Sequence, residues 1–366
     1  MDQNVRHLKF NLYITKPRTF PKRKVLFLYK LEYILTMKFS RIIFSALLVF
    51  SIAFTMFFGY KKLTYQDAEV KPKDYKGILS MWHVDSFEGG SGSRKQFLLD
   101  TAIAFEKQNE GVLVMVTSLS TQGVKEGLDK GESPDLISFG GGVEVKNMSE
   151  LSCDDLSVGG KVGGEGYATA WCKGGYALIA NAEKTDTIPN ELTSLSVSQA
   201  EYTLPLVAFV LEGLTAQNIK VKAPLDAYID FVNGKSDYFL GTQRDVVRLS
   251  NRGLNVVCRP MNAYNDLYQY ISVTATDSEK NLYAQKFVSF LLSETVQKKL
   301  FKISMFSDFY QVDYQDGHLS NLSEIANERT ISAFTPSIKL KELQSQSYLA
   351  VNGDSEALNK IKNMLV

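Results

Sequence analysis

The segment ILSMWHVDSFEGGSGSRKQFLLDTAIAFEKQNEGVLVMVT, residues 78–117, decides the fold class of this chain. It begins with a short apolar run at 78–84, continues through a glycine-rich turn and a helix-forming stretch, and ends with a second apolar run at 112–117. A shorter helical pattern around 124–130 and a third apolar run at 135–139 follow. This alternation of strands and helices predicts an α/β fold with a parallel sheet and right-handed crossovers.

The helix inside this segment has clear start and stop signals. Ser93, with Gln96 three residues later, forms a capping box, which is typical of a helix start. Phe97 and Phe105 fall on one face of the helix, and Gly111 ends it. Because ligands of parallel sheets bind beyond the carboxyl ends of the strands, the first places to search for a site are residues 83–85, 118–120 and 139–141.

The composition is that of a globular protein with a large core. The chain has 366 residues, of which 45% are hydrophobic, 11% aromatic and 22% charged, and this length favours two domains. The net charge of +1 gives no reason to expect a nucleic-acid partner. The charge is unevenly distributed, however, because residues 1–41 have a local balance of +8 and leave the remainder at −7. The basic residues of this head are Arg6, Lys9, Lys16, Arg18, Lys22, Arg23, Lys24, Lys30, Lys38 and Arg41.

An uncharged stretch, IIFSALLVFSIAFTMFFGY at 42–60, follows the basic head. As a helix it would span about 28 Å at roughly 1.5 Å per residue, which is enough to cross a bilayer. The positive-inside rule then predicts a cytoplasmic head at 1–41 and an exported body, held at the cell membrane by a single-pass anchor. Cleavage near Ser51-Ile-Ala53 is the alternative to a retained anchor, and Met37 is a candidate for the true start.

Three cysteines give no sign of a metal centre. Cys153, Cys172 and Cys258 lack CxxC spacing, so a structural zinc site is not expected, and the sequence predicts no cofactor. A disulfide between Cys153 and Cys172 is an alternative in an exported protein, since oxidising compartments permit disulfides. No cysteine follows the apolar run, which excludes a lipid-modified amino-terminal cysteine.

The exported part divides into five segments. Residues 61–76 are a polar linker, 77–173 form a first lobe, and 174–260 form a second lobe after a crossing near 173–175. The chain returns to the first lobe at 264–305, and the tail at 306–366 is left unassigned.

Several later elements are predicted from local patterns. Helices are expected at 204–214 and 224–233, and a strand at 265–274. A long amphipathic helix is expected at 277–302, with Thr276 and Glu279 as its capping box.

Several short sequence phrases occur in an informative order along the chain. A strand ending in Trp-His, the phrase AFEKQNEGVLVMV, the strand DLISFG, and the runs GGYALIANAEK, FVNGKSDYFLGTQRD and AQKFVSFLLSETVQKKL follow one another. In that order they resemble the landmarks of extracellular solute-binding proteins of ABC transporters, of the sugar-binding type. The resemblance covers residues 77–305 and is distributed rather than anchored in one strict motif. Asn109-Glu110-Gly111-Val112 departs from the family pattern because it lacks a proline.

The resemblance implies a two-lobed, periplasmic-binding-protein-like fold of type II with a central cleft. It also implies that the cleft closes by hinge motion on a small solute, a sugar or oligosaccharide, and presents it to the transmembrane subunits of an ABC permease. A solute that contacts both lobes stabilises the closed form, and the partner recognises that form.

Five candidate ligand contacts lie at the end of the first strand and in the turn that follows it. The indole of Trp82 can stack on a sugar ring, and His83 and Asp85 offer hydrogen-bonding groups at the same strand end. Glu88 and Ser91 belong to the glycine-rich turn that opens the helix, whose free backbone N–H groups can receive a hydroxyl or an anionic group. The competing interpretations are core packing for Trp82, a structural role for His83, and a plain capped loop for the glycine-rich turn. A P-loop ending and a GxGxxG motif are absent, which disfavours a nucleotide.

Three further candidates belong to the second lobe and its crossings. Gln243 and Arg244 follow an aromatic run, and arginine can bind carboxylates, phosphates or vicinal hydroxyls. Tyr264 lies near a crossing, where aromatic residues would line a cleft. An ion pair at the surface or hinge competes as an explanation for Arg244, and core packing competes for Tyr264.

Two other functions are weighed against solute binding. A secreted glycoside hydrolase could use paired carboxylates such as Asp85 and Glu88, but nothing in the sequence sets them at catalytic separation. No GxSxG elbow exists and only His7, His83 and His318 are present, so we predict that the chain is not an enzyme. A membrane-tethered sensory or scaffold module with the same fold remains an alternative, which an adjacent kinase gene rather than permease genes would favour.

Overall fold

The computed structural model describes residues 43–54, 75–87 and 92–365. The chain divides into two units, Met1–Pro72 and Lys73–Val366. In the first unit residues 43–54 are helical, and nowhere in the described part of the chain is a helix both long and apolar enough to cross a membrane. The membrane span expected at 42–60 extends into residues outside the described ones and stays a prediction.

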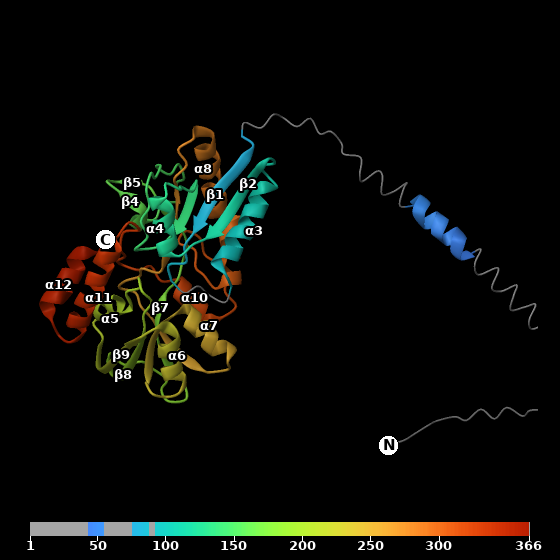
Figure 1. The fold of residues 1–366 in the computed structure, drawn as a ribbon. Coiled ribbons are helices and arrows are strands. Elements are labelled where there is room, and N and C mark those ends of the chain that lie inside the picture. Colours follow the sequence, from blue (N-terminus) through green and yellow to red (C-terminus); the bar gives the residue numbers. More distant parts are fainter. Residues whose placement is uncertain (1–42, 55–74, 88–91, 366) are drawn as a thin grey trace, which may run out of the picture. The chain divides into compact units, whose positions relative to one another are not determined.

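The first sheet of the second unit has five strands in the order β2-β1-β3-β12-β6 (Figure 1). Strand β1 pairs in parallel with β2 and β3, as the alternating pattern predicted, whereas β12 is antiparallel to β3 and β6. Helix α3 packs against β2 and α8 against β12, and α4 lies between β2 and β3 in the chain. The bounds are β1 Gly77–His83, α3 Arg94–Glu106, β2 Val112–Ser118, α4 Thr121–Asp129, β3 Leu136–Phe139, β6 Thr169–Lys173, β12 Tyr268–Val273 and α8 Ser278–Leu292.

Helix α3 begins where the sequence signals predicted. The Ser93 side chain accepts a hydrogen bond from the backbone N–H of Gln96, and Phe97 and Phe105 are buried. The helix ends at Glu106, earlier than expected, and Gly111 adopts φ +89° in the turn into β2. A residue with a Cβ is strained at that φ, so the glycine marks the turn rather than the helix end.

The second sheet also has five strands, in the order β11-β7-β10-β8-β9. Strand β8 pairs in parallel with β9 and β10, while β7 is antiparallel to β10 and β11. The helices predicted at 204–214 and 224–233 are present as α5 and α6. The bounds are β7 Tyr176–Asn181, β8 Glu191–Ser198, α5 Pro205–Leu211, β9 Thr215–Lys222, α6 Pro224–Val232, β10 Tyr238–Thr242, α7 Gln243–Asn251 and β11 Val256–Pro260.

Three segments connect the two sheets. The first joins β6 to β7 and the second joins β11 to β12. They are tied together because Gly174 N–H donates to Leu267 O at 2.7 Å and Asn265 Nδ2 donates to Gly174 O at 2.9 Å. In the third, Phe306 forms a two-way backbone bridge with Lys173, at 2.8 Å in each direction. The connecting segments therefore lie side by side.

The carboxyl-terminal segment, unassigned from the sequence, contacts both halves. Helix α10 packs against α7 and β11, and α11 and α12 pack against each other and against α5. Residues between α10 and α11 reach the first-sheet half, where Ala333 N–H donates to Gly159 O and Gly142 N–H donates to Thr335 O. The remaining bounds are η2 Val158–Gly160, β4 Lys161–Val162, β5 Glu165–Gly166, α9 Glu294–Gln297, η3 Lys298–Ile303, α10 Gly317–Ser323, α11 Ser337–Val351 and α12 Ser355–Met364.

The long helix expected at 277–302 is interrupted. Its amino-terminal cap is Asp277, not Thr276, because the Asp277 carboxylate accepts from the backbone N–H of Lys280. Ser293 takes an extended ψ of 144°, which ends α8 before the short α9 and η3. The Gln297 side chain then donates to the backbone oxygens of Leu291 and Trp171, so a carbonyl at the end of α8 finds its partner in a side chain rather than in the next turn.

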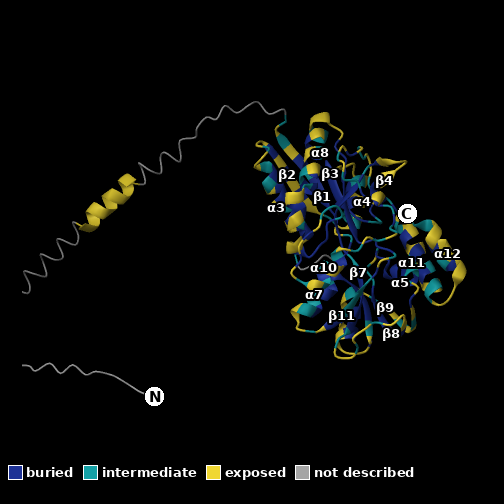
Figure 2. Ribbon diagram, turned by 180° about the vertical axis from the view of Figure 1, so that it is seen from behind, coloured by how far each residue is buried: buried dark blue, intermediate teal, exposed yellow. Residues whose placement is uncertain are grey.

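The hydrophobic core extends along both sheets. One cluster of buried side chains runs from the first sheet into α5 and the second sheet, and its largest fully buried members include Trp171, Tyr176 and Phe287. Figure 2 shows the buried strands inside and the exposed residues on the outer helices such as α12.

Candidate functional site

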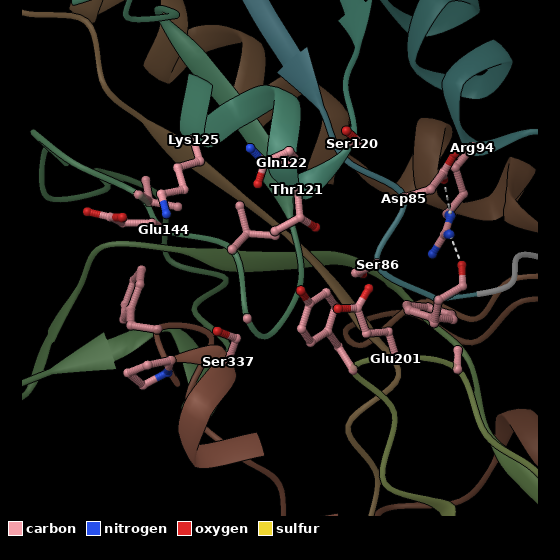
Figure 3. Close-up of a pocket in the computed structure, with 18 of the residues that line it drawn as sticks. Asp85, Ser86, Arg94, Ser120, Thr121, Gln122, Lys125, Glu144, Glu201 and Ser337 are labelled. Atoms are coloured by element: carbon pink, nitrogen blue, oxygen red, sulfur yellow. Dashed lines mark hydrogen bonds and ion pairs between the residues drawn. The ribbon is translucent and has the colours of Figure 1, made fainter. Parts of the chain in front are cut away.

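A pocket of about 1380 Å³ has walls from both halves of the second unit (Figure 3). This exceeds the ~300–1000 Å³ of most small-molecule sites, so it can hold an oligosaccharide-sized ligand. The first-sheet half supplies residues 85–87, 92–94, 120–122, 125, 142–145 and 148, the second-sheet half supplies 200–202 and 244, and the carboxyl-terminal segment supplies 334, 336 and 337.

Strand register explains why these residues meet. His83 of β1 pairs with Ser118 of β2 and with Ser138 of β3, so all three strands end at one level. Leu119 N–H donates to His83 O at 3.0 Å and joins the first two loops. The pocket therefore lies beyond the carboxyl ends of the parallel strands, where the sequence analysis directed the search.

Asp85 is held by two donors. Its Oδ1 receives His83 Nε2 at 3.0 Å and Arg94 Nε at 2.9 Å, while its side chain is 57% exposed. Burial raises the pKa of this carboxyl, but the hydrogen bond from His83 and the charge of Arg94 outweigh it and lower the pKa to about 2. Asp85 is therefore a fixed carboxylate at the pocket wall, available to accept a ligand hydroxyl.

A buried chain of hydrogen bonds fixes the orientation of His83. Ser138 Oγ accepts from Trp171 Nε1 at 2.9 Å and from Gln269 Nε2 at 3.0 Å, which uses both of its lone pairs. Its own proton must then go to His83 Nδ1, 3.1 Å away, so the imidazole carries its proton on Nε2 and donates it to Asp85. This Ser-His-Asp arrangement is not nucleophilic machinery, because Ser138 is fully buried and saturated with partners.

Arg94, the first residue of α3, was not singled out from the sequence. Its guanidinium lies 4.2 Å from the centroid of the Phe87 ring, and Nη2 donates to Phe87 O. Only 3% of the residue is exposed, and burial lowers its pKa. A cation at a helix start opposes the helix dipole, and this mismatch is the signal that could have identified it.

The start of α4 forms the next part of the wall. Ser120 caps the helix by accepting Gly123 N–H at 3.0 Å, and Thr121 and Gln122 occupy its first two positions. Figure 3 shows these residues on one side of the pocket, with Glu201 and Ser337 across from them. Lys125 lies one turn further along the same helix.

Tyr202 contributes the aromatic surface of the second-sheet half, and the sequence analysis missed it. It approaches the first-sheet half so closely at Gly142 that a Cβ added there would lie 2.9 Å from the Tyr202 ring. Together with Phe87 and Phe334 it gives the pocket three aromatic lining residues. No local pattern distinguishes Tyr202, because the loop that carries it meets Gly142 only in the folded chain.

The structure brings only some of the eight predicted ligand contacts to the pocket. Asp85 and Arg244 line the pocket, and His83 lies behind Asp85. Glu88 and Ser91 lie outside the described residues. The other three side chains, Trp82, Gln243 and Tyr264, do not line it.

Each of these three is buried elsewhere. Trp82 packs under α4, where a Cβ added at Gly127 would lie 2.7 Å from the indole. Gln243 is fully buried at the crossing and accepts Gly175 N–H at 3.1 Å. Tyr264 is fully buried as well. For Trp82 and Tyr264 this is the core placement that competed with ligand contact.

The cysteines bear on two questions, a metal centre and a disulfide. Within residues 43–54, 75–87 and 92–365 no group of three or more His, Cys, Asp or Glu side chains is arranged to hold a metal ion. Cys153, Cys172 and Cys258 are free thiols, so the open Cys153–Cys172 pairing is not formed.

Comparison with known proteins gives matches at the level of structure. No protein-family profile matches the chain, and no curated protein matches it significantly. Iron-bound HitA from Pseudomonas aeruginosa has a similar structure, with a TM-score of 0.52 and 16% identity over 74% of this chain and 99% of that one.

Two further structural matches were solved in complex with a ligand. The GacH receptor of Streptomyces glaucescens, solved unliganded and with acarbose, has a TM-score of 0.54 and 13% identity over 80% of this chain and 97% of that one. An ABC substrate-binding protein from Listeria monocytogenes, in complex with cycloalternan, has a TM-score of 0.50 and 14% identity over 79% and 98%. The second unit therefore has the mixed α/β, two-sheet fold of ABC substrate-binding proteins, which confirms the resemblance at the level of the fold.

Proposed function

We propose that this chain is the extracytoplasmic solute-binding component of an ABC importer, and that it captures a carbohydrate between its two halves. The observation that carries the proposal is a large pocket whose lining residues come from both halves of the second unit, which three segments connect. A solute that contacts both walls favours the closed form over the open one by the difference in its contacts, and a permease can read that difference.

The chemistry of the pocket supports a carbohydrate. Sugar rings present apolar faces, which stack on aromatic side chains such as Tyr202 and Phe334, and hydroxyls, which pair with groups such as Asp85 and Ser86. Two of the structurally similar proteins were solved with acarbose and cycloalternan. HitA was solved with iron, but the described residues of this chain offer no cluster of three or more His, Cys, Asp or Glu for a metal.

The location at the membrane is part of the same proposal. The basic head and the uncharged stretch at 42–60 would tether the folded unit on the extracytoplasmic side, near the transmembrane subunits of the permease. Solute delivery then requires no long diffusion step.

A thermal-shift panel on the full-length chain tests the proposal. Mono- and oligosaccharides, polyols, sugar phosphates and amino acids are compared, because a ligand at 100 times its Kd adds about 2.7 kcal/mol to stability. A selective rise with saccharides is the expected result. A folded protein that responds to none of them would contradict the proposal and favour a sensory or scaffold role.

A pair of tyrosine variants locates any binding that is found. Tyr202→Ala removes a pocket aromatic and should weaken saccharide binding about three- to tenfold. Tyr348→Ala removes an exposed tyrosine from α11, outside the pocket, and should leave the Kd unchanged. Equal effects of the two substitutions would exclude this pocket as the saccharide site.

A further inference from the structure

Four helices begin at the pocket. Ser93 and Arg94 at the start of α3, Thr121 of α4, Arg244 of α7 and Ser337 of α11 all line it. Each helix has nine residues or more. A helix start carries roughly half a positive charge. Asp245 in the first turn of α7 offsets the charge of that helix start, so the starts of α3, α4 and α11 are the ones that add a positive potential to the pocket.

The start of α4 has backbone donors to offer. The Ser120 cap uses the N–H of Gly123, and the N–H groups of Thr121 and Gln122 have no acceptor among the described residues. Two adjacent N–H groups at the start of a helix form a natural seat for an oxyanion.

Arg94 supplies a second, independent observation. Its Nη1 is buried without an acceptor among the described residues, whereas Nε and Nη2 are satisfied by Asp85 and Phe87. A buried guanidinium N–H without an acceptor is costly and calls for one. In Figure 3 the guanidinium of Arg94 extends into the same end of the pocket as Ser86, below the start of α4.

The acidic side chains of the pocket leave room for an anion. The charge of Asp85 is compensated by Arg94, although its second oxygen stays available to a ligand hydroxyl, and Glu144 forms an ion pair with Lys146 at 3.1 Å. Glu201 belongs to the opposite wall. The basic side chains Arg94 and Lys125 line the pocket as well, and they offset its carboxylates, so the start of α4 still favours an anion.

We propose that the solute carries an oxyanion group, a carboxylate, sulfate or phosphate ester, and that this group is held by the first amides of α4 beside Arg94. The inference rests on the proposed function and narrows its cargo to acidic saccharides. The oxyanion accepts N–H donors from Thr121, Gln122 and Arg94, while the sugar ring extends toward Tyr202.

Matched pairs of probes separate charge from ring chemistry. Galactose is compared with galacturonate, galactose 6-sulfate and galactose 6-phosphate, and galactotriose with trigalacturonate, by calorimetry on the full-length chain. The acidic member should bind at least tenfold more tightly than its neutral partner. The preference should weaken as salt is added, because screening reduces the attraction. The three acidic forms identify which oxyanion is the ligand.

A proline substitution removes one donor with little change to the helix. Thr121→Pro deletes the N–H at the first position of α4, where proline is well tolerated, and Ser120 already has an extended backbone with ψ 164°. The ratio of neutral to acidic Kd should fall about tenfold. Ser355→Pro makes the same change at the start of α12, where Asp354 caps later amides, and should leave the ratio intact.

The outcomes separate the two proposals. If neutral saccharides bind as tightly as acidic ones, or if Thr121→Pro leaves the ratio unchanged, the oxyanion site is excluded and the solute-binding function stands. If no saccharide of either kind binds, both proposals are overturned. Arg94→Lys provides a second variant, since it retains the charge but not the fork of donors, and it should also reduce the acidic preference.

Discussion

Asp85 shows how a single residue is prepared for binding before any ligand arrives. Its Oδ1 is fixed from below by His83, which the Ser138 network holds in one tautomer, and from the side by Arg94. Neither donor can rotate away without leaving a buried polar group unpaired. The carboxylate is therefore positioned at little entropic cost at the moment of binding.

Replacement of Asp85 should destabilise the fold. Asp85→Asn leaves the buried Arg94 without its carboxylate and should lower the free energy of unfolding by about 1–3 kcal/mol, measured by urea denaturation at pH 7. The folded-state pKa of about 2 lies below the usual 3.8, so the stabilisation is present above about pH 4 and is lost as the pH falls through 2. The exposed Asp129→Asn is the control, and equal stabilities of the two variants would refute the argument.

For single residues, the sequence indicated which residue types could bind a ligand more readily than it indicated where each side chain would lie. Asp85 was found because strand ends are where ligands bind, and it lines the pocket. Trp82 is only three residues away in the chain, yet alternation along β1 directs it under α4. Tyr202 could not be selected from the sequence, since its role depends on a contact with a loop distant in the chain, whereas Arg94 had a local signal in its charge at a helix start.

At the scale of elements, the loop after β3 brings the two halves into contact. Gly142 has φ +86°, and an added Cβ would lie 2.9 Å from Tyr202 and 3.2 Å from Leu340. Gly131 has a similar φ of +79° but has no atom within 4 Å of the added Cβ. The two glycines therefore share a left-handed backbone, which would strain any residue with a Cβ, and they differ in contact.

Alanine at each glycine separates strain from contact. Gly131→Ala should cost about 1 kcal/mol of unfolding free energy, from the strained φ alone. Gly142→Ala should cost at least ~1 kcal/mol more, because Tyr202 must also move, and it should weaken solute binding. Chemical denaturation and calorimetry on both variants check this. Equal losses of unfolding free energy in the two variants would mean that the Tyr202 side chain moves aside without an energetic cost.

Elements were predicted well where the local signal was strong. The strands at 78–84 and 112–117 and the helices α5 and α6 correspond to apolar runs with clear boundaries. The break at Ser293 was not predicted, because the apolar period continues across it. The tertiary bond from Gln297 to Trp171 O, which helps to end α8, cannot be read from a local pattern.

At the scale of the whole molecule, a buried carboxyl lies among the connecting segments. Asp266 accepts Tyr176 Oη at 2.8 Å and the backbone N–H of Leu204 at 3.0 Å. Burial raises its pKa to about 7 although both hydrogen bonds lower it. No ion pair with Asp266 is found among the described residues, and its neighbours include Tyr264, Tyr268 and other tyrosines.

Stability should depend on the protonation of Asp266. Since the folded-state pKa is raised above the usual 3.8, its stabilising contribution is fully present below that pH and is lost as the pH rises through about 7. Asp266→Asn removes this dependence. Relative to the variant, the wild type should lose on the order of a few kcal/mol of unfolding free energy between pH 4 and pH 8. Parallel stability curves of the two proteins would exclude the effect.

Closure should be visible for the molecule as a whole. A solute that bridges the pocket walls should reduce the radius of gyration measured by small-angle X-ray scattering on the full-length chain, because the halves approach each other. The Tyr202→Ala variant should need more solute for the same change. Binding without any change in scattering would argue for a rigid receptor.

The position of β12 has a consequence for the order in which the chain acquires structure. The second sheet is built entirely from residues 176–260, so its strands can pair as soon as that stretch exists. In the first sheet β3 and β6 share no neighbour until β12, at 268–273, inserts between them. During synthesis both edges stay open while the whole second sheet is made, and pairing between such distant segments is slow. Strands β1, β2 and β3 can pair with one another early, but β3 keeps one edge unpaired until β12 is made.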